Sequence, residues 1–259
     1  GLDPKKYPKT WSEMVAYGKA VTKKDASGRV VRWGVGIPGN VGSAQWLFGA
    51  LAAQNGVRLM YDAGNKTDLT NPKVVEALKF WVDLNKVHGI HPPGIQEWGT
   101  TPSDFLEERI AMIWTTTGNL SNLLANSKFE FGLAPYPGNP APASVLGGGN
   151  LYIFKNAPAA EKEAAMKFIK FLTSDELLAD WGIKTGYVAP RDGAWKTEAM
   201  KAYAAKVPDI LVARDQIPVS VPEWSTHENA RTGKVLNDAL AAALTGKKTP
   251  EKALADAQA

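Results

Sequence analysis

The sequence has 259 residues, enough for one large domain or two modest ones. Its 30 basic and 26 acidic residues leave a net charge of +4, too small to indicate a nucleic-acid partner or an anionic membrane. Because cysteine is absent, disulfides, thiolate metal sites and cysteine nucleophiles are excluded. No run approaches the ~20 apolar residues of a membrane span, and the first residues do not resemble a signal peptide. Nine tryptophans indicate heavy cores or stacking surfaces.

Helices and strands alternate along the first half of the chain. Thr10 and Glu13 form a capping-box pattern before an amphipathic helix that begins at Trp11. Asn71 and Pro72 suit the N-cap and first position of a helix that ends near Gly89. The pattern also predicts strands over 30–37, 57–61 and 110–114, helices over 46–53, 102–109 and 120–125, and a polar turn over 115–119.

The second half continues the alternation after a segment rich in proline and glycine. This segment, 135–144, is the best linker candidate in the chain. Strands are predicted over 129–133 and 151–154, and helices over 159–172, 174–183, from about 190 to 207, over 233–244 and from Thr249 onward. A second capping-box pattern, Thr173 to Glu176, precedes one of these helices. The alternation places the chain in the α/β class.

One pattern favours a dinucleotide-dependent oxidoreductase as an alternative function. Gly34, Gly36 and Gly39 match GxGxxG directly after a predicted strand, and Asp62 follows the next strand, where a ribose-binding acid would lie. Pro38 counts against this interpretation, because a proline has no N–H to offer to pyrophosphate. Loss of NADH binding in Gly36→Ala would support it.

Other signals of catalysis or metal binding are weak. His88 and His91 lie three residues apart in a predicted loop, without a third ligand nearby in sequence, and we interpret them as surface histidines. No sequence motif of a nucleophilic or zinc hydrolase is present, and no carboxylate is marked as a general acid. The sequence favours a binding protein over an enzyme, without a metal or cofactor.

Three polar loops at the ends of predicted elements are suited to ligand binding. The turn over 115–119 presents hydroxyls and an amide, the loop over 147–150 presents accessible backbone, and a third loop covers 184–191. Trp46 and Trp114 lie near the first two loops and are candidate stacking faces for a sugar ring. For each tryptophan alone, packing in the core is the simpler interpretation.

A series of short motifs runs in order along nearly the whole chain. The motifs cover 8–13, 52–56, 105–112, 131–136, 146–152, 165–176, 184–187 and 244–254. Together they resemble the C-terminal part of bacterial extracellular solute-binding proteins of carbohydrate-type ABC importers, most of all the branch of glycerol-3-phosphate-binding proteins.

This resemblance implies an α/β, periplasmic-binding-protein-like fold of type II, with two lobes that close on a ligand like a hinged clamp. It assigns residues 1–134 to the C-terminal lobe, 135–190 to the N-terminal lobe and 191–259 to the C-terminal lobe again. Because family members are longer, the N-terminal lobe is expected to be largely missing from this chain. Residues 135–190 would then expose the face that normally contacts that lobe.

The resemblance also implies a periplasmic receptor without a cofactor. Its partners would be a carbohydrate or polyol ligand and the permease subunits of an ABC transporter. The family's binding positions fall on Gln45, Trp46, Gly118, Asn119, Gly148, Gly149 and Tyr187, and Trp224 is a further candidate stacking face. Gly233 stands where a phosphate-binding arginine is expected, with Arg231 two residues earlier. The missing arginine counts against glycerol phosphate as the ligand. A neutral sugar, another polyol or a different sugar phosphate stays open.

Overall fold

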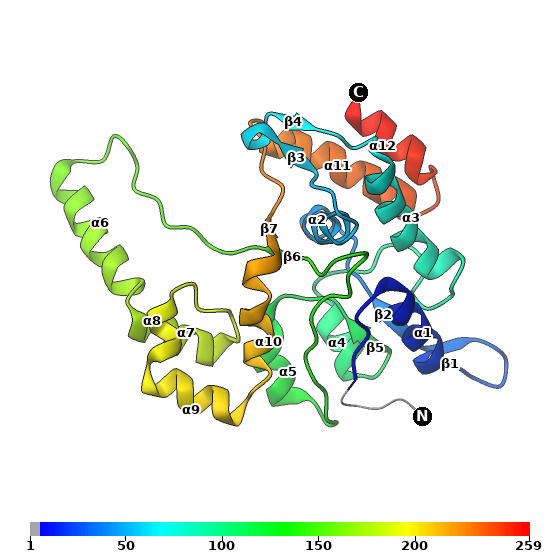
Figure 1. Cartoon of the computed structure of the whole chain (residues 1–259), viewed down its shortest axis with the longest axis horizontal. Coiled ribbons are helices and arrows are strands. Elements are labelled where there is room, and N and C mark those ends of the chain that lie inside the picture. Colours follow the sequence, from blue (N-terminus) through cyan, green and yellow to red (C-terminus); the bar gives the residue numbers. More distant parts are fainter. Residues whose placement is uncertain (1–5) are drawn as a thin grey trace. The chain divides into compact units, whose positions relative to one another are not determined.

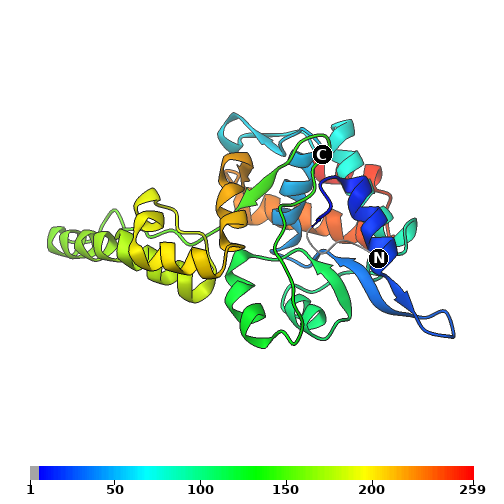
Figure 2. The same ribbon diagram turned by 60° about the horizontal axis from the view of Figure 1, so that its bottom comes forward.

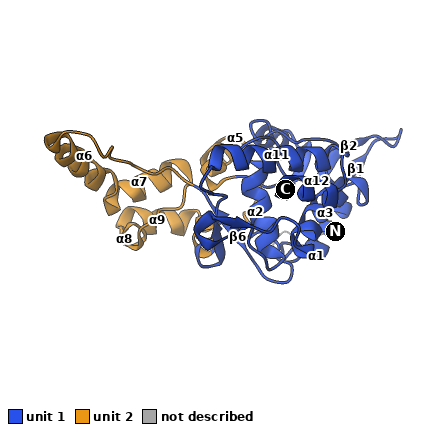
Figure 3. Cartoon of the chain, turned by 90° about the horizontal axis from the view of Figure 1, so that it is seen from above, with its two compact units in different colours: residues 1–115, 134–147, 216–259 blue, residues 116–133, 148–215 orange. Residues whose placement is uncertain are grey.

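The computed structural model describes residues 6–259, which divide into two compact units (Figures 1 and 3). Unit 1 contains the residues up to Thr115, together with 134–147 and 216–259. Unit 2 contains residues 116–133 and 148–215. One unit boundary lies at Ala134, beside a predicted lobe boundary, but no unit boundary lies near residue 190, and the assignment of segments to lobes stays a prediction.

The first helix and strands of unit 1 follow the sequence pattern closely. Helix α1 (Trp11–Val21) begins where the Thr10 hydroxyl accepts the N–H of Glu13, at 3.2 Å. The Glu13 carboxylate completes the cap one residue earlier than the pattern implies, because it accepts the N–H of Lys9. Strand β2 (Val30–Gly36) pairs antiparallel with β1 (Lys23–Lys24) and parallel with β5 (Ile110–Ile113). The turn between β1 and β2 projects from the rest of unit 1 (Figures 1 and 2).

Four helices pack together around the main core of unit 1. They are α2 (Ala44–Gln54), α3 (Pro72–Lys86), α11 (Asn229–Leu244) and α12 (Pro250–Gln258). In Figure 1, α2 is seen down its axis, with α3 and α11 beside it. The buried side chains of this core include Leu47, Phe48, Leu51, Leu78, Trp81, Leu236, Leu240 and Leu254. Burial of these side chains holds α2 rigidly, and α2 carries two of the predicted binding residues.

Shorter elements complete unit 1. They are β3 (Met60–Tyr61), β4 (Lys66–Thr67), α4 (Thr101–Leu106), β6 (Ser144–Leu146) and β7 (Ser220–Pro222), with 3-10 turns at Asp62–Gly64 and Ile217–Val219. β6 and β7 form a parallel pair. The strand predicted over 57–61 is reduced to its last two residues, and the segment predicted as a linker leads into β6 at Ser144.

The structure describes unit 2 throughout, and it contains no strand. Its helices are α5 (Leu120–Asn126), α6 (Ala159–Leu172), α7 (Asp175–Thr185), α8 (Asp192–Lys196), α9 (Glu198–Lys206) and α10 (Ile210–Asp215), preceded by a 3-10 turn, η2 (Thr117–Asn119). Its core is small, and consists of Ala179, Ala189, Ala194, Met200 and Ile210. Helix α6 contributes no buried residue to it.

Three predictions for unit 2 are wrong. Segments 129–133 and 151–154 have the composition of strands but have no strand partner. The N-cap of α7 is Ser174 rather than Thr173, because the Ser174 hydroxyl accepts the N–H of Leu177 while the Thr173 hydroxyl donates to the carbonyl of Ile169.

Candidate functional site

Trp46 lines an open hollow of about 290 Å³ at the start of α2. The loop that precedes the helix forms one wall, and Trp98 forms another. The rings of Trp46 and Trp98 meet edge to face, with centroids 5.7 Å apart and planes at 78°. The complete lining is Asn40, Val41, Gly42, Ser43, Trp46 and Trp98, and none of these described residues is charged. The hollow therefore offers flat apolar rings beside neutral polar groups, a combination suited to sugars and polyols.

Hydrogen bonds fix the walls of this hollow. The indole N–H of Trp46 donates to the carbonyl of Leu146, at 3.2 Å. A Cβ at Gly147 would lie 3.0 Å from the Trp46 Nε1 atom, so only glycine lets the backbone pass this close without a shift. The Asn40 Oδ1 atom accepts the Ser43 hydroxyl at 2.7 Å and the N–H of Trp98 at 3.0 Å. Both tryptophans are thus held in place before any ligand arrives.

Gln45, the neighbour of Trp46, is tied to helix α11. Its N–H donates to the Asn237 Oδ1 atom at 3.2 Å, and its own Oε1 atom accepts the Asn237 amide at 3.1 Å. A Cβ at Gly233 would lie only 2.8 Å from the Gln45 Oε1 atom. The Gln45 side chain therefore lies against the position where the resemblance implies a phosphate-binding arginine. Its NH₂ group has no partner in the described part of the chain and is available as a donor.

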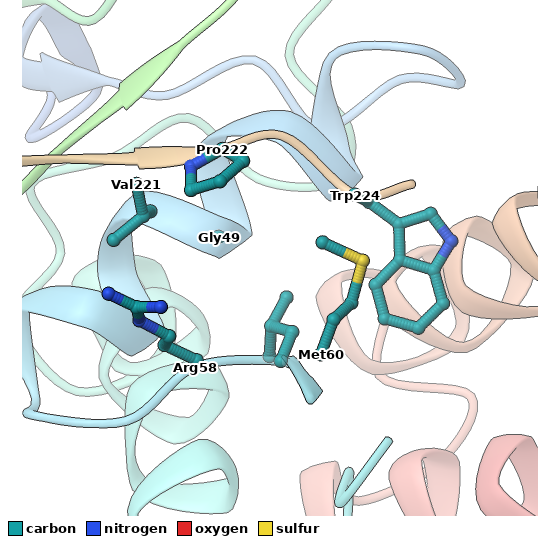
Figure 4. Close-up of a pocket in the computed structure, with 7 residues that line it drawn as sticks. Gly49, Arg58, Met60, Val221, Pro222 and Trp224 are labelled. Carbon is teal, nitrogen blue, oxygen red and sulfur yellow. The ribbon is translucent and has the colours of Figure 1, made fainter. Parts of the chain in front are cut away.

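Trp224 lies at a different place in unit 1, and it is buried. Its indole N–H donates to the Thr232 hydroxyl at 3.3 Å. It lines a small apolar cavity of about 70 Å³, with Arg58 on the opposite side (Figure 4). The other lining residues are Gly49, Leu59, Met60, Val221 and Pro222. A cavity of this size holds only a few non-hydrogen atoms, so Trp224 offers no open face to a sugar ring.

In unit 2, two predicted positions come together. The ring of Tyr187 lies directly on Gly118, since a Cβ at Gly118 would overlap the ring. Gly186 ends α7 in the left-handed conformation, with φ +88°, and thereby directs the chain back toward η2. The N–H of Gly118 donates to the Thr116 hydroxyl at 3.3 Å, and Asn119 is the last residue of η2. Tyr187, which is partly exposed, and the end of η2 form one polar patch.

Gly148 and Gly149 stand apart from this patch. A Cβ added to either would meet nothing within 4 Å, so their backbone is open to approach. The described structure thus brings the predicted site positions together in two groups. Gln45 and Trp46 are neighbours in unit 1, and Gly118, Asn119 and Tyr187 lie together in unit 2. Whether these residues bind a ligand stays a prediction.

Trp114 is not a stacking face for a ligand. It is buried and stacks on Tyr136, with ring centroids 4.2 Å apart and planes at 21°. Burial raises the pKa of Tyr136, whose hydroxyl donates to the carbonyl of Thr115 at 3.4 Å. Among the residues that line the hollow, Trp98 is the tryptophan that the sequence analysis did not single out as a site residue. It lies beside Trp46 because two distant segments meet there.

The interpretation of His91 as a surface histidine is wrong. Its imidazole is buried, and its Nε2 atom accepts the N–H of Ile37 at 3.0 Å. The other ring nitrogen must therefore carry the proton and donate to the carbonyl of Pro92, at 2.7 Å. Burial lowers the pKa of His91, which keeps the ring neutral. His91 thus connects the loop after α3 to the end of β2, in a structural role.

The glycines of the GxGxxG pattern serve packing. A Cβ at Gly34 would overlap the backbone of Gly18, and a Cβ at Gly36 would lie 2.8 Å from Ile110 Cδ1. The N–H of Gly39 is already bonded to a neighbouring carbonyl. These glycines leave no cradle of free N–H groups for a pyrophosphate, and the dinucleotide alternative finds no support.

Residues 6–259, the part of the chain that the structure describes, contain neither a metal-binding cluster nor a membrane-spanning helix. No group of three or more histidine, cysteine, aspartate or glutamate side chains is placed to hold a metal ion. No helix in this range has the length and apolar character needed to cross a membrane.

Comparisons with known proteins agree on the family. The family model for bacterial extracellular solute-binding proteins matches residues 3–208. The sn-glycerol-3-phosphate-binding periplasmic protein UgpB of Pectobacterium atrosepticum is 26% identical over 272 residues, which cover 98% of this chain and 59% of that protein. This chain therefore spans about three-fifths of the length of the curated relatives that it matches.

Solved structures show the same fold. UgpB from Mycobacterium tuberculosis, in complex with glycerophosphocholine, has a TM-score of 0.85 and 24% identity over 98% of this chain and 63% of that one. Maltose-bound MalE3 of T. maritima has a TM-score of 0.82 and 26% identity over 98% of this chain and 65% of that one. These structures confirm the expected α/β, periplasmic-binding-protein fold. They also confirm the expectation that this chain is shorter than its relatives. The chain belongs to the family of bacterial extracellular solute-binding proteins.

Proposed function

We propose that this chain is the larger part of the periplasmic, non-catalytic solute-binding component of an ABC importer, and that its solute is a neutral sugar or polyol. The observation that carries the proposal is the hollow beside Trp46 and Trp98, whose described lining contains no charged side chain. In the whole protein the solute would lie between two lobes, and the closed protein would deliver it to the permease subunits.

The two indoles suit a sugar or polyol. Sugar rings have apolar C–H faces that pack on flat aromatic rings, while their hydroxyls need hydrogen-bond partners around the rim. Trp46 and Trp98 lie at right angles, so they offer two apolar walls rather than one. The free NH₂ group of Gln45, on the same helix, is a donor for a hydroxyl. This combination supports binding without any chemistry on the ligand.

The absence of cations in the hollow argues against a phosphate. A phosphate taken out of water needs charge-assisted hydrogen bonds, which arginine or lysine supplies best. Gly233 stands at the position expected for such an arginine, and the Gln45 side chain lies against it. The relatives named UgpB are described as binding sn-glycerol 3-phosphate or glycerophosphocholine, and MalE3 as binding maltose. We place the present chain with the second kind of solute.

The test is a calorimetric titration of the protein encoded by the whole reading frame with maltose, ribitol and glycerol 3-phosphate. We expect saturable binding of a neutral compound, and an affinity about tenfold or more weaker in Trp46→Ala, because the stacking face is lost. Trp181→Ala is the matched control, since Trp181 is exposed on α7 in unit 2.

Two results would contradict the proposal. One is tight binding of glycerol 3-phosphate with no binding of the neutral compounds. The other is a Trp46→Ala variant that binds a neutral compound as tightly as the unchanged protein does.

A further inference from the structure

The small cavity beside Trp224 lies wholly within unit 1 and is separate from the hollow beside Trp46. The two share no lining residue. Leu59 and Trp224 are buried and form the apolar interior of the cavity, whereas Arg58 is exposed. Figure 4 shows Arg58 and Trp224 on opposite sides of it. The cavity thus combines an apolar interior of about 70 Å³ with one cation at its entrance.

Contacts between distant segments hold the walls of this cavity in place. The Trp224 indole N–H donates to the Thr232 hydroxyl at 3.3 Å, and the N–H of Ser225 donates to the Met60 sulfur at 2.9 Å. Val221 lies on β7, which is paired with β6. These contacts are made without a ligand. The cavity is therefore preformed, which lowers the entropic cost of binding.

Gly49 keeps the cavity open. It lies in the interior of α2, where glycine is less favourable than alanine. At Gly36 and Gly39 an added Cβ would come too close to a neighbouring side chain, but at Gly49 it would meet nothing within 4 Å. Crowding therefore does not explain a glycine at this position. The missing side chain leaves room that a larger residue would fill.

Arg58 is a cation without a partner in the described part of the chain. No hydrogen bond or ion pair involves its guanidinium within residues 6–259, and Glu223, which follows a lining residue, does not pair with it. Each of the other six arginines forms an ion pair with an aspartate or glutamate, namely Arg29, Arg32, Arg109, Arg191, Arg214 and Arg231. The guanidinium of Arg58 is therefore available to an external anion, and its planar fork suits a carboxylate.

We propose that this cavity binds a short-chain monocarboxylate. Its alkyl chain lies between Leu59 and Trp224, and its carboxylate pairs with Arg58. The volume admits a chain of about two or three carbons, since one water occupies about 30 Å³ in the liquid. A dicarboxylate would bring a second charge against the apolar interior, at a large desolvation cost. The inference goes beyond the proposed function and does not depend on which solute is bound.

The test follows the tryptophan indole resonances of the isotope-labelled protein, encoded by the whole reading frame, by NMR during titration with sodium propionate. The resonance of Trp224 is identified with Trp224→Phe. We expect it to shift saturably, with a Kd in about the millimolar range because the ligand has few atoms. Propionamide has the same shape without the charge. It is expected to bind at least about tenfold more weakly, because a charge-assisted hydrogen bond is lost.

Two variants separate the contributions of charge and space. Arg58→Gln is expected to weaken propionate binding at least about tenfold, because the carboxylate loses its cation. Arg29→Gln is the matched control, since it removes the same charge from an exposed position of unit 1. Gly49→Val is expected to abolish propionate binding by filling the cavity. An unchanged Tm shows that each variant is folded.

Four outcomes would overturn the proposal. The first is the absence of a saturable shift at Trp224, and the second is a shift confined to Trp46, since propionate would then occupy the hollow. The third is propionamide binding as tight as that of propionate. The fourth is Arg58→Gln binding propionate as tightly as the unchanged protein does. None of these outcomes involves the solute of the importer, so the inference can fail while the proposed function stands.

Discussion

Unit 1 and unit 2 differ in how much apolar surface they bury. Unit 1 has a continuous core of leucine, phenylalanine and tryptophan side chains that links four helices to a sheet. Unit 2 has a core of three alanines, one methionine and one isoleucine, and its longest helix, α6, buries none of its residues. The difference teaches that apolar burial is concentrated in unit 1. Unit 1 buries a continuous core, whereas unit 2 leaves both phenylalanines of α6, Phe168 and Phe171, exposed.

The largest expected loss of stability follows from deleting an aromatic ring inside the core of unit 1. Phe48 is fully buried on α2. Phe48→Ala is expected to lower the free energy of unfolding by about 3–5 kcal/mol, because the burial of the ring is lost and a cavity stays behind. Chemical denaturation followed by tryptophan fluorescence measures the change.

Phe171→Ala in α6 is the matched control for this variant. Its ring is exposed, so the same deletion is expected to cost less than about 0.5 kcal/mol in the 259-residue chain. Similar losses for both variants would remove the distinction between the two units.

A smaller loss of stability, which originates in unit 1, is expected when the pH is lowered. Burial holds the pKa of His91 below its usual value, so between these two values the unfolded chain binds a proton that the folded chain does not. Stability is therefore fully present above about pH 6.5 and falls as the pH drops below it, by up to about 1.4 kcal/mol per pH unit. Urea unfolding between pH 5 and 7.5 measures this slope.

The variant His91→Gln is expected to be less stable at neutral pH and to have a flatter profile. His88 also has a lowered pKa through partial burial and the nearby charge of Lys19, which is why single variants are needed to separate the two. His227→Gln, at an exposed position, is the control. An unchanged slope in His91→Gln would mean that His91 does not carry the pH dependence.

The sequence was most informative where local signals decide the structure. Helix starts at Trp11 and Pro72 were predicted because a cap depends on residues within one turn. The bounds of α6 were also predicted to the residue, although its N-cap residue, Pro158, makes no side-chain cap hydrogen bond. The fold itself was predicted through the resemblance to a family, and the comparisons confirm it.

The N-cap of α7 was missed by one residue within a single turn, but the other misses share a physical cause, because each depends on a distant segment. His91 is buried only since β2 brings Ile37 to its ring. Trp98 joins the hollow only through its contact with Trp46. Residues 151–154 have the composition of a strand, but a strand needs a partner, and the described residues supply none.

The difference between the units is tested most directly by native-state hydrogen exchange on the 259-residue chain. Our account predicts that the amides of α2 exchange only through global unfolding of unit 1, because that helix is buried, whereas the amides of α6 exchange orders of magnitude faster. Protection of α6 equal to that of α2 would contradict the account, since it would show that the small core of unit 2 stabilises its helices as much as the core of unit 1 does.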